Sequence, residues 1–328
     1  MKRIRVAHFG IAHDHSGVTM DCVRSHPDVF EVVAVCEPDE ETRAKFGGDA
    51  VYEGIPWITE EELLSRKDID AVLCEGNELR SVSDAQKCID HGMHVHLDKP
   101  GGTDLAAFEK LIRDAERKGL TLQMGYMYRY NPAMRYVLKS VREGKLGDIT
   151  GIDATFCCRH TPEKRRWLKQ FPGGMMFFLG CHSIDMILQN NGLPQRVVPF
   201  NRSSGFENDG SLDTAFAVLD YPNGVCTVRS NATECNGYSH RRLLVVGTKG
   251  TIDICPLESP TLVRETTQKH AEELGWRDAS DGVFPGFLSS RYDDMMLEFA
   301  ACVRGEMKNP YTGDYEIELQ RIVLEACK

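Results

Sequence analysis

A short turn near the N-terminus has the beginning of a dinucleotide-binding loop, Gly-x-Gly-x-x-Gly. In such a loop the first glycine permits a tight turn, the second lets the backbone approach a pyrophosphate, and the third lets helix and strand pack closely. Only the first is present, because Ala12 and His15 replace the others and Gly17 follows two residues later. Alone, the pattern fits an ordinary strand-to-helix turn equally well. The candidate cofactor residues are Gly10, Ile11, Ala12, His13 and His15.

An acidic residue follows the second apolar run of the chain. Glu37 stands where a carboxylate accepts hydrogen bonds from the ribose 2′-hydroxyl of a dinucleotide. The same charge would repel a 2′-phosphate, so Glu37 favours NAD over NADP. The alternative is a solvated residue before Pro38.

Two histidine pairs invite a metal interpretation. His13 and His15 flank Asp14, but two histidines at i, i+2 need a third and a fourth ligand, and the sequence names none. His94 and His96 alternate along one run, with no carboxylate partner expected. We therefore expect no metal, and we expect His13 to hydrogen-bond a phosphate or a substrate.

A lysine lies directly after another apolar run, in the turn Asp98-Lys99-Pro100-Gly101-Gly102. Ligands of doubly wound sheets bind outside the carboxyl ends of the strands, so this lysine is placed at the cofactor crevice. Proline restricts the backbone and the glycines allow close approach, which favours a functional turn over a solvated lysine.

The most apolar segment, Met175–Leu188, follows Gly173-Gly174 and has His182 and Asp185 as its only acidic or basic side chains. We expect a buried helix, in which both groups need partners. Three positions apart, they share a helix face, so Asp185 can fix the imidazole tautomer of His182. A satisfied core pair is the alternative.

Apolar runs up to Met124 alternate with amphipathic segments, which predicts a parallel, doubly wound sheet. Thr59 and Glu62 fit a capping box, Thr103 is expected to cap a later helix, and Gly119 to end it. The expected strands are Ile4–Phe9, Phe30–Cys36, Ile69–Cys74, Met93–Leu97 and Leu120–Met124.

Beyond Met124 the alternation ends. A helix is expected from Asn131-Pro132 to Glu143, and Asn223-Gly224 reads as a hairpin turn between strands. The expected strands are Gly147–Cys158, Leu212–Tyr221, Val225–Asn231 and Arg241–Val246, followed by a loop at Val283–Phe287 and closing helices at Arg291–Arg304 and Tyr315–Cys327. The chain therefore reads as a Rossmann domain at residues 1–124 and an α+β domain with an open, mostly antiparallel sheet at residues 125–328.

Composition excludes several classes of protein. The 328 residues suffice for two domains, and a net charge of −10 without a basic stripe argues against nucleic acid. We see neither a signal-like segment nor an apolar run long enough to span a membrane. The twelve cysteines form no Cys-x-x-Cys pair, which favours reduced thiols and a cytoplasmic protein.

Five motifs together resemble the Gfo/Idh/MocA oxidoreductases, the family of glucose–fructose oxidoreductase and inositol dehydrogenase. The turn at Lys99 is similar to the Glu-Lys-Pro motif of that family, with Asp98 in place of glutamate. The other matching segments are Cys74-Glu75-Gly76-Asn77, Gly125–Pro132, Glu143–Ile149 and Gly173-Gly174 through Asp185.

The resemblance implies NAD(P) and a sugar, inositol or related polyol as substrate. It implies Lys99 and His182 as catalytic residues, with Asp98 and the Cys74, Gly76 and Asn77 turn at the cofactor. The residues expected at the substrate are Tyr126, Arg129, Arg159, His160, Trp167 and Asp185. We read Lys164-Arg165-Arg166 as a solvated charge run and the Met175–Phe178 stripe as packing.

Phe178 departs from the family, in which many members carry an aspartate four residues before the histidine, on the same helix face. A phenyl ring can neither take a proton nor hold a hydroxyl. Either His182 acts with Lys99 alone, another polar residue such as Tyr126, Arg159 or His160 substitutes, or the chemistry has changed. The leading hypothesis is an NAD-dependent dehydrogenase in which His182 takes a hydroxyl proton and Lys99 stabilises the developing charge.

Two alternatives remain open. One is an NAD-using glycosidase or lyase that oxidises a hydroxyl transiently so that a neighbouring substituent is eliminated. The other is a sugar- or nucleotide-binding protein without turnover. An open sheet with one apolar face also predicts a homodimer or homotetramer through the second domain.

Overall fold

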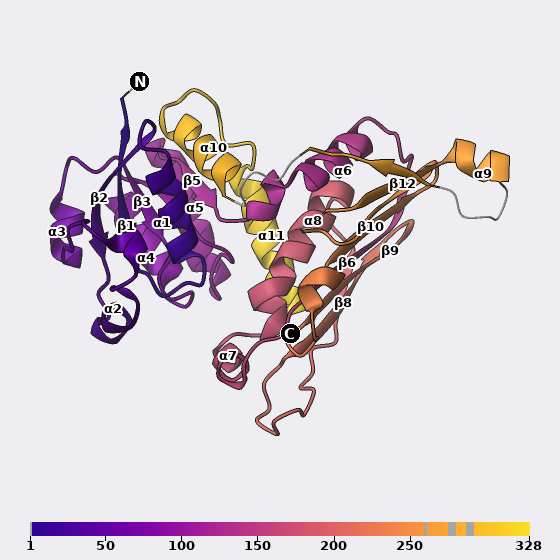
Figure 1. Ribbon diagram of the computed structural model, residues 1–328, viewed down its shortest axis with the longest axis horizontal. Coiled ribbons are helices and arrows are strands. Elements are labelled where there is room, and N and C mark those ends of the chain that lie inside the picture. The colour runs from indigo at the N-terminus through magenta and orange to yellow at the C-terminus, as the bar shows by residue number, and fades with distance from the viewer. Residues whose placement is uncertain (1, 259–260, 275–279, 287–291) are drawn as a thin grey trace. The chain divides into compact units, whose positions relative to one another are not determined.

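The computed structural model describes residues 2–258, 261–274, 280–286 and 292–328. The chain divides into two compact units (Figure 1). The first contains residues 1–127 and 289–320, and the second contains residues 128–288 and 321–328. The return of residues 289–320 to the first unit was not anticipated from the sequence.

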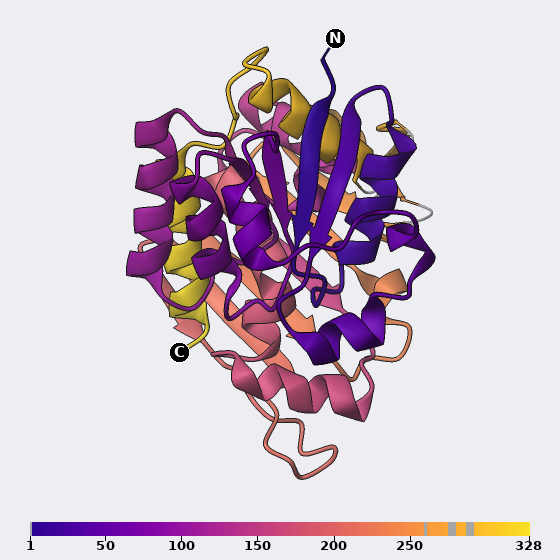
Figure 2. The same cartoon turned by 90° about the vertical axis from the view of Figure 1, so that its left-hand side faces the viewer.

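The first unit is a parallel sheet with helices on both faces (Figure 2). Its described strands pair in the order β2-β1-β3-β4-β5, all in parallel, which confirms the doubly wound fold. The strands are β1 Ile4–Phe9, β2 Phe30–Cys36, β3 Ala71–Cys74, β4 His94–Leu97 and β5 Leu122–Met124. The helices are α1 Ser16–Ser25, α2 Glu40–Phe46, α3 Glu60–Ser65, α4 Ser81–Asp90, α5 Leu105–Lys118, α10 Asp293–Val303 and α11 Gly313–Ala326, the last ending in the second unit.

Helix ends in this unit follow local side-chain chemistry. The capping box of α3 is present, with the Thr59 hydroxyl accepting from the amide of Glu62 and the Glu62 carboxylate accepting from the amide of Thr59. The expected cap of α5 was wrong by one residue, because the Asp104 carboxylate, not Thr103, accepts from the first free amides. Gly119 ends α5 in the left-handed conformation, as expected.

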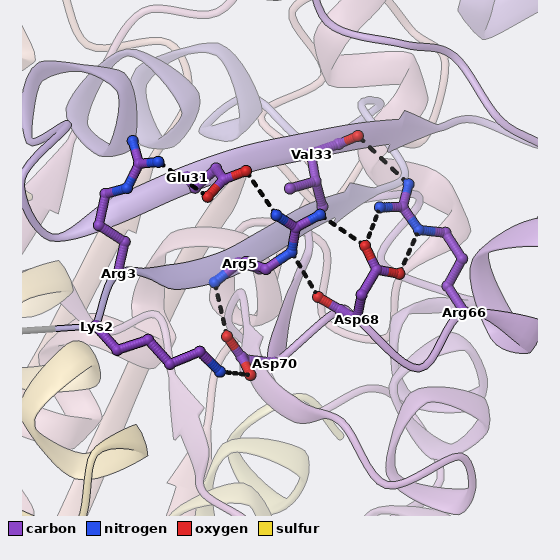
Figure 3. A network of polar contacts seen from close by, with 8 residues as sticks. All are labelled: Lys2, Arg3, Arg5, Glu31, Val33, Arg66, Asp68 and Asp70. Atoms are coloured by element: carbon purple, nitrogen blue, oxygen red, sulfur yellow. Dashed lines mark hydrogen bonds and ion pairs between the residues drawn. The ribbon is translucent and has the colours of Figure 1, made fainter.

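The two ends of the parallel strands differ in chemistry. At the amino ends, an ion-pair network joins Arg5 to Glu31 and Asp68, each at 2.6 Å, and Lys2 to Asp70 at 3.2 Å (Figure 3). These groups are partly exposed, so each pair contributes about 0–1 kcal/mol of stability. Buried polar groups gather instead at the carboxyl ends, where the candidate site lies.

The second unit is a mixed sheet with α6 and α8 on one face (Figure 1). Its described strands run in the order β13-β12-β11-β10-β6-β9-β8-β7, and β6 pairs with β9 in parallel while the other neighbours are antiparallel. The strands are β6 Ile149–Cys157, β7 Arg196–Pro199, β8 Thr214–Tyr221, β9 Gly224–Asn231, β10 Arg242–Gly247, β11 Gly250–Ile254, β12 Val263–Thr267 and β13 Asp281–Val283. The helices are α6 Pro132–Arg142, α7 Pro162–Trp167, α8 Cys181–Asn191 and α9 Gln268–Leu274.

Two local sequence predictions for this unit are also confirmed, the start of α6 and the hairpin turn. Asn131 caps α6, and the tight turn before Gly224 joins β8 to β9. Val283 ends strand β13 instead of lying in the expected loop, and Phe287 lies outside the described residues. All twelve cysteines lie in the described part of the chain, and each is a free thiol. Within the same residues, no helix has the length and apolar content that crossing a bilayer requires.

Candidate functional site

The loop between β1 and α1 is closely packed against the turn that follows β3. Gly10 has a φ of +80°, and a Cβ there would lie 2.3 Å from the Cα of Gly76. Only glycine adopts this conformation at so short a distance without strain. The two turns therefore pack backbone to backbone, and both glycines line the same cleft.

The Glu37 carboxylate is hydrogen-bonded to the backbone of the same loop. Its Oε2 accepts a hydrogen bond from the amide of Ile11 at 2.7 Å, and its Oε1 accepts one from the amide of Asp39 at 2.9 Å. Each carboxylate oxygen has a second lone pair, so Glu37 can still accept from a ligand hydroxyl. Ile11 itself turns its side chain into the core beside Met20.

One cleft contains several of the expected cofactor residues. Gly10, Ala12, Glu37, Gly76 and Asn77 all line it, together with Pro38, Asp39, Thr42, Arg80 and Asp84. Sequence reasoning missed Arg80, which brings a positive charge to the cleft and lies 3.6 Å from the carboxylate of Asp84. Its position just before α4, after the glycine turn, was the signal that could have revealed it.

His15 is accommodated differently from a glycine. Gly17 is not a close-packing glycine, because a Cβ on it would meet only Val51, at 4.0 Å. The imidazole of His15 instead turns toward the Lys99 turn, where its Nδ1 lies 2.9 Å from Oδ2 of Asp98. The bulky residue is thus held by a charged partner.

Asp98 joins both histidines of the loop. Its Oδ2 also lies 3.2 Å from Nδ1 of His13, and Nε2 of His13 lies 3.6 Å from Glu78. Burial pulls the pKa of His13 down, but the charge and hydrogen bond of Asp98, with the charge of Glu78, outweigh it and raise the pKa above 6.5. Burial prevails at His15, whose pKa is lowered. Burial would raise the pKa of Asp98, yet the two histidines hold it well below its usual range.

Nδ1 of His13 faces two groups, since the amide of His15 also lies 3.1 Å from it. A protonated Nδ1 cannot accept that amide hydrogen, so the raised pKa favours the ion pair with Asp98. Asp98 also accepts from the amide of Lys99 through Oδ1, at 2.6 Å. Lys99 is only 2% exposed, and its charge acts on both imidazoles. The sequence did not predict this cluster.

Two expectations for the sheet need correction. The thiol of Cys74 points into the core, where a hydrogen bond with Cys88 and burial hold its pKa well above the ordinary value. Only the backbone of Cys74 is left for a ligand. His96 does have a carboxylate partner, because the Glu75 side chain lies 3.9 Å from its Nε2. Glu75 follows β3, and the sequence does not show that its side chain turns into the core.

His182 lies in the second unit, on the first turn of α8, and is 1% exposed. Its ring packs edge-on against Tyr128 at 5.0 Å and beside Phe156 at 6.3 Å. Tyr128 donates to Glu258 and accepts from Arg241 at 2.6 Å. Sequence reasoning missed this buried group, whose members are far apart along the chain.

Asp185 is held by a forked ion pair. Arg129 donates to it through Nε and Nη2 at 2.9 to 3.2 Å, and Gln189 donates at 2.9 Å. Both charged side chains are 1% exposed. Arg129 and Asp185 are thus brought together, as neutralising partners inside the unit. That Asp185 sets the tautomer of His182 stays a prediction.

Phe178 does not extend the surroundings of His182. Met176–Gly180 forms a wide π-helical turn before α8, which removes the simple four-residue spacing expected of one helix face. Phe178 packs against His160 at 5.7 Å and against Trp167 at 5.4 Å, ring to ring. His160 and Trp167, both expected at the substrate, therefore both pack against Phe178.

The basic run Lys164-Arg165-Arg166 in α7 is not simply the solvated charge run that the sequence indicated. The Lys164 ammonium lies 3.6 Å from the centre of the Trp167 ring. Arg165 is buried: its guanidinium forms an ion pair with Glu207 at 2.7 Å and donates through Nη1 to the carbonyl of His160 at 2.6 Å. Arg159 is exposed and donates to the thiol of Cys235.

Tyr126 lies just beyond β5 in the first unit and is 1% exposed. The expected site residues therefore form separate groups in the two units.

The residues at the β1–α1 turn fit a dinucleotide. The space between Gly10 and Gly76 would be filled by any Cβ, the turn leads into the amino end of α1, and Glu37 supplies a hydroxyl acceptor. The residues that would hold the cofactor are Gly10, Ala12, Glu37, Gly76 and Asn77.

Known proteins resemble the chain along most of its length. A family model described as an oxidoreductase family with an NAD-binding Rossmann fold matches residues 7–126, and one described as the GFO/IDH/MocA C-terminal domain matches residues 134–253. The uncharacterized oxidoreductase YrbE of Bacillus subtilis is 24% identical over 284 residues, covering 83% of this chain and 80% of the relative.

Two further proteins are similar. The scyllo-inositol 2-dehydrogenase (NADP(+)) IolW of Bacillus subtilis is 31% identical over 137 residues, covering 41% of this chain and 38% of the relative. The structure of an aldose-aldose oxidoreductase from Caulobacter crescentus, complexed with glycerol, covers 99% of this chain and 98% of its own, with a TM-score of 0.81 and 18% identity. The latter likeness shows a shared fold.

Proposed function

The chain belongs to the Gfo/Idh/MocA oxidoreductases, and on that premise we propose that it is an NAD-dependent dehydrogenase of a sugar, inositol or related polyol. The observation that carries the proposal is the close approach of Gly10 and Gly76 beside Glu37, which builds a cofactor cleft within the first unit. The inositol dehydrogenase relative supports the substrate class.

The cleft favours NAD. Glu37 and Asp39 place two carboxylates on it, and a 2′-phosphate would meet both charges. Arg80 is the group that could attract such a phosphate, but Asp84 competes for its guanidinium. When bound, the nicotinamide supplies the redox chemistry, and the protein orients the reactants and excludes water.

Lys99 and His182 are the proposed catalytic residues. Lys99 is held at the carboxyl end of β4 by its amide bond to Asp98, and its ammonium would stabilise negative charge on the reacting oxygen. His182, fixed by the rings of Tyr128 and Phe156, would take the hydroxyl proton as general base.

The wall around Phe178 suits a substrate with an apolar face. The rings of Trp167 and Phe178 pack at 86° to each other, the Lys164 ammonium lies over the Trp167 ring, and the His160 ring packs against Phe178. We propose that Trp167, His160 and Arg159 contact the substrate, and that Tyr126 does so as well.

The purified protein would be tested against a panel of sugars, inositols and sugar acids while NADH formation is followed by absorbance. The proposal expects NADH formation with at least one substrate, and its loss in Lys99→Met. Cleavage of a glycoside by protein that retains NAD, with no net NADH, would favour the glycosidase or lyase alternative. Failure to bind NAD(H) at millimolar concentration would refute both.

We also propose that the chain forms a homo-oligomer through the second unit. Side chains on β8 and β9 alternate between buried and partly exposed, so among the described residues one face of these two strands stays partly exposed. Light scattering coupled to size exclusion would show a monomer if this is wrong.

A further inference from the structure

Two groups of side chains in the described part of the chain bring three metal-ligand atoms within 4.8 Å of one another. One is the His13, His15 and Asp98 cluster, and the other is Cys22, His26 and Asp293. The second group lies in the first unit, outside the proposed cofactor cleft, and the proposed function makes no use of it.

The first group is poorly suited to a cation. The carboxylate of Asp98 already contacts both imidazoles and accepts from the amide of Lys99. The positive charge of Lys99 acts on both imidazoles of that cluster. The local charges therefore favour cation binding by Cys22, His26 and Asp293 over binding by the His13, His15 and Asp98 cluster.

The second group combines three kinds of ligand. Cys22 and His26 are four residues apart at the end of α1, so they share a side of the helix, and Asp293 begins α10. Oδ1 of Asp293 lies 3.3 Å from Sγ of Cys22 and 3.1 Å from Nε2 of His26. In a tetrahedral zinc site with bonds of about 2.3 Å to sulfur and about 2.0 Å to nitrogen or oxygen, ligand atoms lie roughly 3.3–3.5 Å apart. The observed separations are within a few tenths of an ångström of these values.

We propose that Cys22, His26 and Asp293 bind a divalent cation of the zinc type. Sγ, Nε2 and Oδ1 supply three ligands, and a water molecule fills the fourth position, because the His26 and Asp293 side chains remain 26% and 27% exposed. Thiolate, imidazole and carboxylate together are a zinc-like donor set.

The charge around Cys22 supports a cation. The carboxylates of Asp293, Asp21 and Glu75 act on its thiol, so the surrounding charge is negative. In the metal-free protein the thiol donates a hydrogen bond to Asp293. Binding replaces this proton by the metal ion, so each ion bound by the thiolate releases one proton and involves no oxidation.

The bound ion would cross-link α1 to α10. Helix α1 follows the loop of Gly10 and His15, and α10 belongs to the segment that returns to the first unit after the second. A ligand that binds only the folded protein stabilises it by mass action. Binding is therefore expected to stabilise the first unit, and the readout of this stabilisation does not depend on the proposed oxidoreductase activity.

The test is a Co²⁺ titration of the full chain after chelator treatment. We expect a thiolate-to-cobalt band in the near ultraviolet, visible bands of tetrahedral cobalt, displacement by Zn²⁺, and a Zn²⁺-dependent rise in melting temperature. Cys22→Ser should abolish the near-ultraviolet band, and His26→Gln and Asp293→Asn should weaken cobalt binding about tenfold or more.

Cys302→Ser is the matched control, because Cys302 is a buried thiol on α10 outside the cluster. It should bind cobalt like the wild type. The proposal is overturned if the wild type gives no thiolate band, if the band survives Cys22→Ser, or if His26→Gln and Asp293→Asn bind cobalt as tightly as the wild type. These readouts need no catalytic assay.

Discussion

Replacing Asp98 by asparagine should reverse the direction of the His13 pKa shift. The Asp98 carboxylate lies 3.2 Å from Nδ1 of His13 and 2.9 Å from Nδ1 of His15. In the wild type its charge outweighs burial at His13 and raises the pKa above 6.5. An asparagine amide has the same shape but no charge, so burial then prevails, and the pKa of both histidines falls below 6.5.

The sign of the stability effect follows from these shifts. A raised pKa means that protonated His13 stabilises the folded wild type fully below pH 6.5, and that this contribution is lost as pH rises through the folded pKa. In Asp98→Asn a His13 that stays fully neutral would instead cost about 1.4 kcal/mol near pH 5.5, about one unit below the unfolded pKa. The stability difference between the two proteins should therefore widen as the pH falls from about 8 to about 5.5.

NMR titration of the imidazole resonances measures the shifts directly, and urea unfolding at the two pH values measures the free-energy difference. Asp90→Asn is the matched control, since Asp90 is half-exposed and accepts from Gln86 and Lys118. A His13 pKa that stays above 6.5 in Asp98→Asn would refute the reasoning, because Glu78 would then be the dominant charge. A constant stability difference across this pH range would refute it equally.

Further predictions concern the cofactor, the catalysis and the fold. Glu37→Gln should raise the Kd for NAD about tenfold or more, because a hydrogen bond to a charged acceptor contributes about 1.5–3 kcal/mol; calorimetry that gave an unchanged Kd would contradict the role. Lys99→Met should lower kcat about 10²–10³-fold, and His182→Gln should lower it about 10²–10⁴-fold. A variant with the steady-state rate of the wild type would show that its residue is not catalytic. Asp185→Asn should destabilise the protein by about 3–5 kcal/mol, because it removes the carboxylate charge that pairs with the buried guanidinium of Arg129; an unchanged melting temperature would contradict this.

Local features of the fold could be predicted because they depend on neighbours in sequence. β1 and β2 have the bounds that their apolar runs indicated, and β3, β4 and β5 begin one or two residues later. The capping box of Thr59 and the stop at Gly119 need only residues within one helical turn. Asp104 was missed in favour of Thr103 because both side chains can cap, and the choice depends on where the first turn begins.

Features that depend on distant partners could not be predicted. His15 and Asp98 are 83 residues apart, and their contact needs the turns after β1 and β4 to converge. Arg165 looked solvated within a run of basic residues, but Glu207 supplies a carboxylate that lets it be buried. In each case residue type was informative, while the partner was decided by tertiary packing.

Asp98 and His15, two departures from the family pattern, are physically one feature. A histidine at the third glycine position introduces a bulky ring beside a buried turn, and its polar nitrogens need partners there. Asp98, in place of a glutamate, reaches both imidazoles through one oxygen and the Lys99 amide through the other. The space is tight, because a Cβ on Gly125 would lie 2.9 Å from Oδ1 of Asp98. The shorter carboxylate therefore compensates for the larger residue, and the charge cluster they form keeps Lys99 at the carboxyl end of β4, where a substrate oxygen would be bound.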